Sequence, residues 1–150
     1  MSQSLAQVYL HIVFSTKHQV TLIPNDQAKD LYQYLAGILG NLRCPAIIIN
    51  GTSNHVHLLS KLHRTITISS LIEETKRSSS KWFKSQPGVP QRFYWQNGYG
   101  VFSIGQSGVS EVKRYIAHQE AHRKHQTFQD EYLDFLRKYD LEYNEKYLWD

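Results

Sequence analysis

This chain of 150 residues has little cysteine, and its sequence shows no long apolar run and no pattern typical of an export signal. Its one cysteine, Cys44, allows no disulfide within the chain, which favours a reducing, cytoplasmic setting. No apolar run approaches the roughly 20 residues that a membrane-spanning helix needs. The N-terminus has neither a basic nor an apolar segment, and this predicts no secretory signal. Internal repeats, low-complexity segments and linkers are also missing, so we expect a single domain over residues 1–150.

Charge and hydrophobicity are moderate. The hydrophobic content of 41% and the charged content of 20% are those of an ordinary globular protein with a real core. The net charge of +4 at pH 7 points to an anionic partner, nucleic acid first, although such a charge is also common in small proteins. Composition alone therefore leaves the partner open.

Hydrophobic periodicity predicts the elements of the chain. Apolar residues at every second position indicate a strand over 7–14, and apolar residues three and four apart indicate helices. The Asn97-Gly98 dipeptide is a strong signal for a hairpin, because both turn residues tolerate positive φ. The expected helices cover 25–42, with Asn25 as cap, 66–83, 109–124, with Ser107 or Ser110 as cap, and a segment from Phe128; the expected strands cover 46–49, 54–62, 92–96 and 99–104.

The order of these elements predicts an α+β fold. The first six form the ferredoxin-like split βαβ arrangement, an antiparallel sheet with its first two helices on one face. We expect the hairpin to add a strand, and the helix over 109–124 to be a catalytic helix that covers the open face. A C-terminal helix and tail over 128–150 should pack back onto this unit.

The most informative motif is Asn54-His55-Val56-His57-Leu58-Leu59. Side chains alternate along a strand, so His55 and His57 share one face while Val56 points to the other. Two imidazoles on one face make half of a metal site. Alone the motif is weak, because buried structural histidines are common. By the same alternation His11 also belongs to this open face, either as a supporting or DNA-contacting residue or as a half-exposed strand histidine.

A second element strengthens the metal hypothesis. Tyr115 and Gln119 lie four residues apart on the predicted helix over 109–124, so they are neighbours on its surface. If this helix covers the open face, it presents a phenol and an amide oxygen to His55 and His57. Two imidazoles and one amide oxygen would leave open positions on a divalent ion for a substrate oxygen.

Together these motifs resemble a known family, the single-tyrosine HUH transposases of bacterial insertion sequences. The subgroup associated with repetitive extragenic palindromes is especially similar, and the resemblance covers nearly the whole chain. Beyond the histidine strand and the tyrosine helix, it rests on the segments His11-Ile12-Val13-Phe14, Lys76-Arg77-Ser78-Ser79-Ser80-Lys81-Trp82 and Trp95-Gln96-Asn97-Gly98-Tyr99-Gly100.

The resemblance implies a reaction. In this family a tyrosine attacks single-stranded DNA, forms a 5′-phosphotyrosine and releases a 3′-hydroxyl, and Mg²⁺ or Mn²⁺ polarises the scissile phosphate. Carried onto this chain, Tyr115 is the nucleophile, and His55, His57 and Gln119 are the metal ligands. The family recognises hairpin-forming element ends, and many relatives are homodimers in which the tyrosine helix acts in trans, while the palindrome-associated subgroup includes monomers.

Basic side chains on two helices are candidates for DNA contacts. Cations interleaved with serines suit phosphates, although a solvated helix face is an equally good explanation. Tyr99 and Trp95 could stack on unpaired bases, but core packing is the simpler role for Trp95. The candidate DNA-binding residues are His11, Arg64, Lys76, Arg77, Lys81, Lys84, Lys113, Arg114, His122 and Arg123.

Two other functions compete with a DNA strand transferase. The first is a catalytically silent nucleic-acid-binding protein domesticated from such an enzyme, for which the fold and the basic helix would suffice. The second is a zinc-dependent hydrolase in which His118, His122 or His125 joins His55 and His57. The absence of a His-Glu-x-x-His motif disfavours the hydrolase.

Overall fold

A four-stranded antiparallel sheet organises the protein. The computed structural model describes residues 2–150 and, at Arg123, the main chain only. The sheet has the order β2-β3-β1-β4, which is the predicted split βαβ order. Its strands are β1 (Tyr9–Ser15), β2 (Ala46–Gly51), β3 (His55–Lys61) and β4 (Gly100–Ile104).

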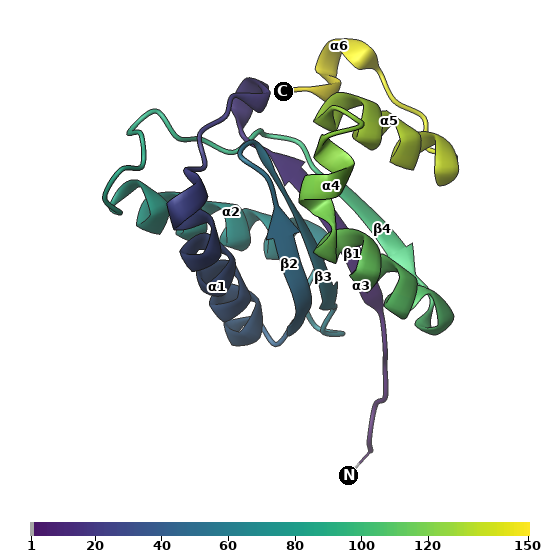
Figure 1. Cartoon of the computed structure of the whole chain (residues 1–150). Coiled ribbons are helices and arrows are strands. Elements are labelled where there is room, and N and C mark those ends of the chain that lie inside the picture. The colour runs from purple at the N-terminus through teal and green to yellow at the C-terminus, as the bar shows by residue number, and fades with distance from the viewer. Residues whose placement is uncertain (1) are drawn as a thin grey trace.

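Eight helical segments surround this sheet (Figure 1). Within residues 2–150 no helix combines the length and apolarity needed to cross a membrane. The segments are η1 (Lys17–Gln19), α1 (Asn25–Asn41), α2 (Ile68–Lys84), η2 (Gln106–Gly108), α3 (Val109–Ala117), α4 (Gln119–Arg123), α5 (Phe128–Lys138) and α6 (Glu145–Leu148).

Helices α1 and α2 cover one face of the sheet (Figure 1). The alternating residues Leu10, Ile12 and Phe14 of β1 pack there beside Val56 and Leu58 of β3, as the sequence predicted. All five side chains are at least 97% buried. This face forms the main core, since each buried Leu or Phe contributes about 1.5–3 kcal/mol relative to exposure.

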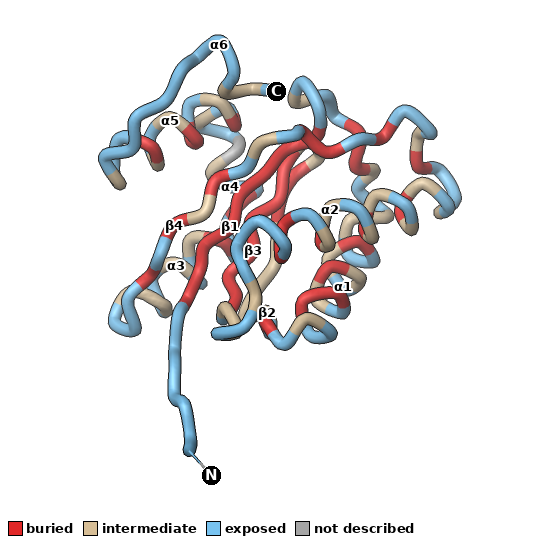
Figure 2. The backbone as a smooth tube through the Cα atoms, turned by 180° about the vertical axis from the view of Figure 1, so that it is seen from behind, coloured by how far each residue is buried: buried red, intermediate tan, exposed pale blue. Residues whose placement is uncertain are grey.

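The second face is covered by the C-terminal helices. Ile116 of α3 packs with Tyr9 and Leu59, and α5 packs Phe128 and Tyr132 against the sheet residues Val13 and Phe102. Figure 2 shows the central strands as a buried band between the two layers of helices. The predicted open face is therefore covered, and His11, at 1% exposure, is fully buried rather than half-exposed.

The predicted hairpin strand over 92–96 is wrong. This segment makes only an isolated bridge between Trp95 and Thr16, and neither Asn97 nor Gly98 has a positive φ. Lys76 of α2 holds this segment in place of a hairpin turn. Its ammonium donates hydrogen bonds to the main-chain carbonyls of Gln96 (2.7 Å), Asn97 (3.3 Å) and Gly98 (2.6 Å). Burial lowers the pKa of Lys76 to about 8, so the ammonium keeps all three donors at pH 7.

The predicted continuous helix over 109–124 is also wrong. It breaks at His118, where φ is −108° and ψ is 31°, into α3 and α4. Asn50 of β2 supplies the reason, because its amide donates to the carbonyls of Ile116 (3.0 Å) and Ala117 (3.3 Å), which a continuous helix would need for itself. Tyr115 and Gln119 therefore lie on different helices.

Two predicted helix caps differ as well. Asn25 is the first residue of α1, and the N-cap position belongs to Pro24, which offers no side-chain acceptor. Gly108 holds the N-cap position of α3 in place of Ser107 or Ser110. Thr67 caps α2 by accepting from the Ser70 N–H at 3.1 Å, and Thr127 caps α5 in the same way.

The Lys76 contacts generate a stability prediction. Lys76→Met should lower the free energy of unfolding by about 2 kcal/mol, because it leaves three loop carbonyls without their shared donor. Urea denaturation at pH 7 measures this loss. Lys81→Met is the matched control, since Lys81 lies exposed on the same helix and should change stability by less than about 0.5 kcal/mol. Equal effects of the two substitutions would contradict a structural role for Lys76.

Candidate active site

Strand β3 places two histidines under the C-terminal helices. His55 and His57 are 4% and 0% exposed, and both direct Nε2 toward the same oxygen, Oε1 of Glu131. The Nε2–Oε1 distances are 3.4 Å for His55 and 2.9 Å for His57. The sequence predicted that the two imidazoles share a face, and this shared target confirms it.

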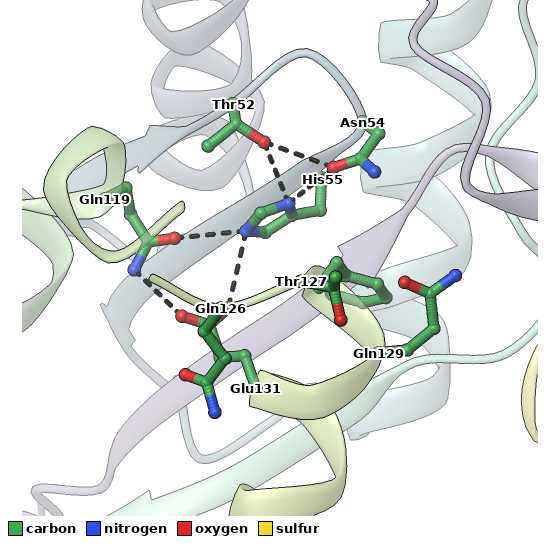
Figure 3. Close-up of a pocket in the computed structure, with 9 residues that line it drawn as sticks. Thr52, Asn54, His55, Gln119, Gln126, Thr127, Gln129 and Glu131 are labelled. Atoms are coloured by element: carbon green, nitrogen blue, oxygen red, sulfur yellow. Dashed lines mark hydrogen bonds and ion pairs between the residues drawn. The ribbon is translucent and has the colours of Figure 1, made fainter. Parts of the chain in front are cut away.

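The orientation of His55 is fixed from its other ring nitrogen. Nδ1 lies 2.8 Å from Asn54 Oδ1 and 3.0 Å from the Thr52 hydroxyl (Figure 3). The amide oxygen of Asn54 can only accept, so Nδ1 carries the proton in this assignment. In a neutral His55 the lone pair therefore sits on Nε2. That atom faces Gln119 Oε1 at 3.1 Å as well as Glu131.

His11 fixes the orientation of His57. Its Nε2 lies 2.8 Å from His57 Nδ1, and the His11 ring meets both Phe102 and Phe135 edge-on. If His57 Nδ1 donates to His11, the Nε2 lone pair of His57 is free to bind a metal. His11 therefore supports the site through His57.

Glu131 of α5 is the site residue that sequence reasoning missed. Its carboxylate reaches His55, His57, Tyr115 and Gln119, and the residue is 5% exposed. A signal was present, because Glu131 occupies position i+3 from Phe128 and i−4 from Phe135 on the apolar stripe of α5. A carboxylate in an apolar stripe is rarely buried without a partner.

Tyr115 lies on α3 beside these ligands. Its hydroxyl donates a hydrogen bond to Oε2 of Glu131. The phenol ring stacks on His122 at a centroid distance of 4.3 Å and meets His57 edge-on at 6.0 Å. The structure therefore brings Tyr115, Gln119, His55 and His57 of one chain together.

Burial and hydrogen bonding shift the pKa values in this cluster. Burial lowers the pKa of His57 and, with a contribution from His57, lowers that of His11 well below 6.5. Burial alone would raise the pKa of Glu131, but its contacts with the His55 and His57 imidazoles outweigh burial and hold the pKa of this carboxyl group well below its usual range. Burial and the bond to Glu131 raise the pKa of Tyr115. The resting cluster thus holds a carboxylate, neutral His11 and His57, and a protonated phenol.

The donor set fits a divalent cation. With the only ring proton of His55 on Nδ1, its Nε2 faces two oxygens, Gln119 Oε1 and Glu131 Oε1, and none of these three atoms carries a hydrogen. Among the described residues, His55, His57 and Glu131 place one ligand atom each within 4.8 Å of one another. Imidazole nitrogen and carboxylate oxygen are ordinary ligands of divalent metals. A positive ion would pair these converging lone pairs.

A pocket opens directly beside this cluster. It has a volume of about 240 Å³, and His55, Gln119 and Glu131 lie in its wall (Figure 3). Gln126 and Thr127, just before α5, and Gln129 in its first turn also line the pocket. A substrate oxygen entering the pocket would therefore reach the proposed metal ligands directly.

His11, one of the predicted DNA-binding residues, is buried against His57. The others fall into two groups, apart from Arg123. Lys113 and Arg114 are exposed on α3 near Tyr115, and His122 lies against the Tyr115 ring. The other group lies on or before α2, on the opposite side of the sheet (Figure 1); it comprises Arg64, Lys76, Arg77, Lys81 and Lys84. The predicted contact at Arg123 lies outside the described side chains.

Several of these cations have partners within the chain. Lys76 holds the loop over 96–98, Arg77 donates to Glu74, and Lys84 lies 3.5 Å over the ring of Tyr94. Trp95 is buried and donates to the Ser79 hydroxyl at 2.9 Å, so it serves the core. The exposed ring of Tyr99 borders a hollow of about 360 Å³ over α2.

The zinc hydrolase hypothesis does not fit the geometry. The metal-binding cluster in the described part of the chain contains none of the helix histidines. His118 bonds to the Arg114 carbonyl at 2.7 Å, and His122 stacks on Tyr115. The third residue of that cluster, Glu131, comes from α5 instead.

Comparison with protein families identifies the chain. The family described as transposase IS200 like matches residues 4–119, which include His11, both site histidines, Tyr115 and Gln119. The chain belongs to the IS200-like transposase family. Its members are DNA-cleaving enzymes, so this assignment supports transposase function. Glu131 lies beyond the residues that the family description matches.

Solved structures show the same fold. A candidate transposase from Deinococcus radiodurans R1 matches 79% of this IS200-like chain and 98% of its own, with a TM-score of 0.61 and 19% identity. A REP-associated tyrosine transposase, solved bound to a REP hairpin, matches 79% of this chain and 72% of its own, with a TM-score of 0.56 and 13% identity. A comparison with curated protein sequences finds no match.

The buried histidines make stability depend on pH. In the unfolded chain His11 and His57 take up protons near pH 6.5, whereas in the fold their pKa values are lower. As pH falls below 6.5 the unfolded state therefore binds more protons, and the free energy of unfolding falls by up to about 1.4 kcal/mol per pH unit for each histidine. Urea denaturation in EDTA between pH 7 and pH 5 measures this slope, above the range in which Glu131 adds its own dependence.

Two variants test the assignment of this slope. His11→Asn should flatten it, because one of the two buried imidazoles is gone. His125→Asn, at an exposed position, should leave it unchanged. A wild-type protein with no loss of stability between pH 6.5 and 5 would show that the buried imidazoles are protonated in the fold.

Proposed function

We propose that this protein cleaves and rejoins single-stranded DNA through a covalent bond to Tyr115. The observation that carries the proposal is the contact of a half-buried tyrosine with two imidazoles, an amide and a carboxylate at the edge of a pocket. Family membership supports DNA as the substrate. The protein would form a 5′-phosphotyrosine, as the resemblance of the sequence implies.

A divalent cation, Mg²⁺ or Mn²⁺, would be held by His55, His57 and Gln119. When bound it supplies positive charge that stabilises the oxygens of the attacked phosphate. The tyrosine nucleophile needs this stabilisation. A tyrosine with a pKa near 10 is about one part in a thousand ionised at pH 7, so forming the phenolate costs about 4 kcal/mol. Burial of Tyr115 makes the cost larger.

The covalent step conserves the energy of the phosphodiester. The Tyr115 oxygen bonds to phosphorus, the bond from phosphorus to the 3′ oxygen breaks, the phenol loses a proton and the 3′ oxygen gains one. The phenol is a better leaving group than a sugar alcohol, so a second 3′-hydroxyl can reverse the step without ATP. A tyrosine nucleophile therefore suits strand transfer, whereas attack by water would end in hydrolysis.

The DNA would contact both sides of the sheet. Lys113 and Arg114 flank the tyrosine and can approach the backbone beside the cleaved bond. Lys81 and the hollow bordered by Tyr99 would bind DNA beyond the cleavage site, with stacking on unpaired bases. A hairpin is the proposed ligand, because a structurally similar transposase was solved bound to a REP hairpin.

A single chain would suffice for the site. The resemblance left open a homodimer in which the tyrosine helix acts in trans. In this chain Tyr115 packs against His57 and Glu131 of its own sheet and helix. We therefore propose that the nucleophile works in cis.

The nucleophile can be tested with labelled hairpin DNA on a denaturing gel. The wild-type protein should give a shifted covalent band with Mn²⁺ or Mg²⁺ and none with EDTA. Tyr115→Phe should reduce attachment by at least about a thousandfold, because it removes the attacking oxygen, while the dissociation constant for DNA stays within about threefold. Tyr139→Phe, at a tyrosine near the same helix, is the control and should still attach DNA.

Attachment of DNA by Tyr115→Phe would refute Tyr115 as the nucleophile. Metal-independent binding without attachment would favour the silent binding protein.

Mixing two inactive variants tests assembly in cis. Tyr115→Phe and His57→Ala each lack one half of the site. If the site forms within one chain, an equimolar mixture should stay as inactive as either variant alone. Recovery of roughly a quarter to a half of wild-type attachment would mean that one subunit lends its tyrosine to another.

A further inference from the structure

Glu131 holds a position that needs a chemical explanation. It lies on α5, outside the residues 4–119 that the family shares, yet it contacts all four proposed site residues. Its helix is anchored to the sheet by Phe128 and Tyr132. The contact is therefore built into the fold of this chain.

The two carboxylate oxygens of Glu131 face different groups. Oε1 lies 2.9 Å from His57 Nε2 and 3.4 Å from His55 Nε2. Oε2 accepts from the Tyr115 hydroxyl and lies 3.5 Å from Gln119 Nε2. One oxygen thus belongs to the proposed metal position and the other to the nucleophile.

The charge of Glu131 lacks a permanent counterion. Its ion-pair partners in the described part of the chain are His55 and His57 alone, and neither is a permanently charged lysine or arginine. Burying a carboxylate is unfavourable unless a cation or several hydrogen bonds compensate its charge. A divalent ion between Oε1 and the two imidazoles would supply the missing positive charge.

We propose that Glu131 is a catalytic carboxylate shared by the metal and the nucleophile: Oε1 ligates the divalent ion with His55 and His57, and Oε2 accepts the proton of Tyr115. This inference rests on the proposed function and adds a residue that the family resemblance does not supply. It makes α5 part of the active site.

The proton balance of the step is closed. Glu131 is a weak base in the resting cluster, but the phenol oxygen becomes strongly acidic as its bond to phosphorus forms. At that point the phenolic proton moves to Oε2 of Glu131. The bond to the 3′ oxygen breaks, that oxygen takes a proton from water, and Glu131 returns its proton to solvent. In the reverse step the 3′-hydroxyl loses a proton and the tyrosine oxygen regains one.

Glu131→Gln tests whether Glu131 acts as metal ligand and proton acceptor or only fills space. The amide keeps the size of the side chain and an oxygen that can ligate, but it has no charge and cannot accept the proton. Asp134→Asn is the matched control, because Asp134 is an acid one turn away on α5 that pairs with Arg137 at the surface. Wild type and both variants are compared in Mn²⁺ binding by calorimetry and in single-turnover DNA attachment at saturating Mn²⁺.

The expected results are specific to Glu131. Glu131→Gln should raise the dissociation constant for Mn²⁺ at least about tenfold. At saturating Mn²⁺ it should still attach DNA about a hundredfold more slowly than wild type, as loss of a general base does. Asp134→Asn should stay within about twofold of wild type in both assays. The rise in melting temperature with Mn²⁺, taken against each variant's own metal-free protein, reports binding even in a destabilised variant.

Two results would overturn the inference. Unchanged Mn²⁺ affinity in Glu131→Gln would remove Oε1 from the metal site, and a wild-type attachment rate at saturating Mn²⁺ would remove Oε2 from the proton transfer. Failure of the proposed function would look different. The wild type would bind Mn²⁺ but attach no DNA, and His57→Ala would no longer bind Mn²⁺. In that case proton transfer at Glu131 fails too, while the Mn²⁺ measurement still decides whether Glu131 is a ligand.

Discussion

The pairing of β1 with β3 is the interaction on which the site depends. The register sets Val13 opposite His57 and Ser15 opposite His55. The two central strands thus present imidazoles on one face and an apolar core on the other. A shift of the register by one residue would exchange the faces and bury the apolar side chains under the wrong helices. The core under α1 and α2 therefore fixes the position of both proposed metal ligands.

Polar groups on a buried sheet face must find partners, and this requirement shapes the C-terminal part of the chain. His11 and His57 bond to each other, and His55 bonds to Thr52 and Asn54 in the turn before its strand. The Nε2 atoms of His55 and His57 face α4 and α5, where they meet Gln119 and Glu131. The C-terminal helices thus complete the hydrogen bonding of the sheet as well as its hydrophobic packing.

Patterns within one element predicted most of the fold. Alternation in β1 and β3 identified both faces of the sheet and the shared face of His55 and His57, because strand geometry has a fixed period of two. The order of the elements was enough for the sheet topology. These inferences succeeded because they depend on local periodicity and on connection rules that apply to all proteins.

Contacts between distant segments explain what the sequence could not show. The break at His118 arises from Asn50, 66 residues from the first carbonyl it binds, and Lys76 overrides the hairpin signal of Asn97-Gly98 from another helix. Glu131 joins the site from an element with no motif of its own. Its position in an apolar stripe was visible, but its destination depends on how α5 docks on the sheet.

The break between α3 and α4 has a mechanical meaning. Tyr115 sits near the end of α3 and Gln119 at the start of α4, with His118 in a non-helical conformation between them. A DNA strand joined to the phenol would pull on α3. Helix α4 is a separate helix, and its axis does not have to move with that of α3. If Tyr115 is the nucleophile, tension on a strand joined to it would act on α3, and the break at His118 would separate that tension from the Gln119 amide that faces His55.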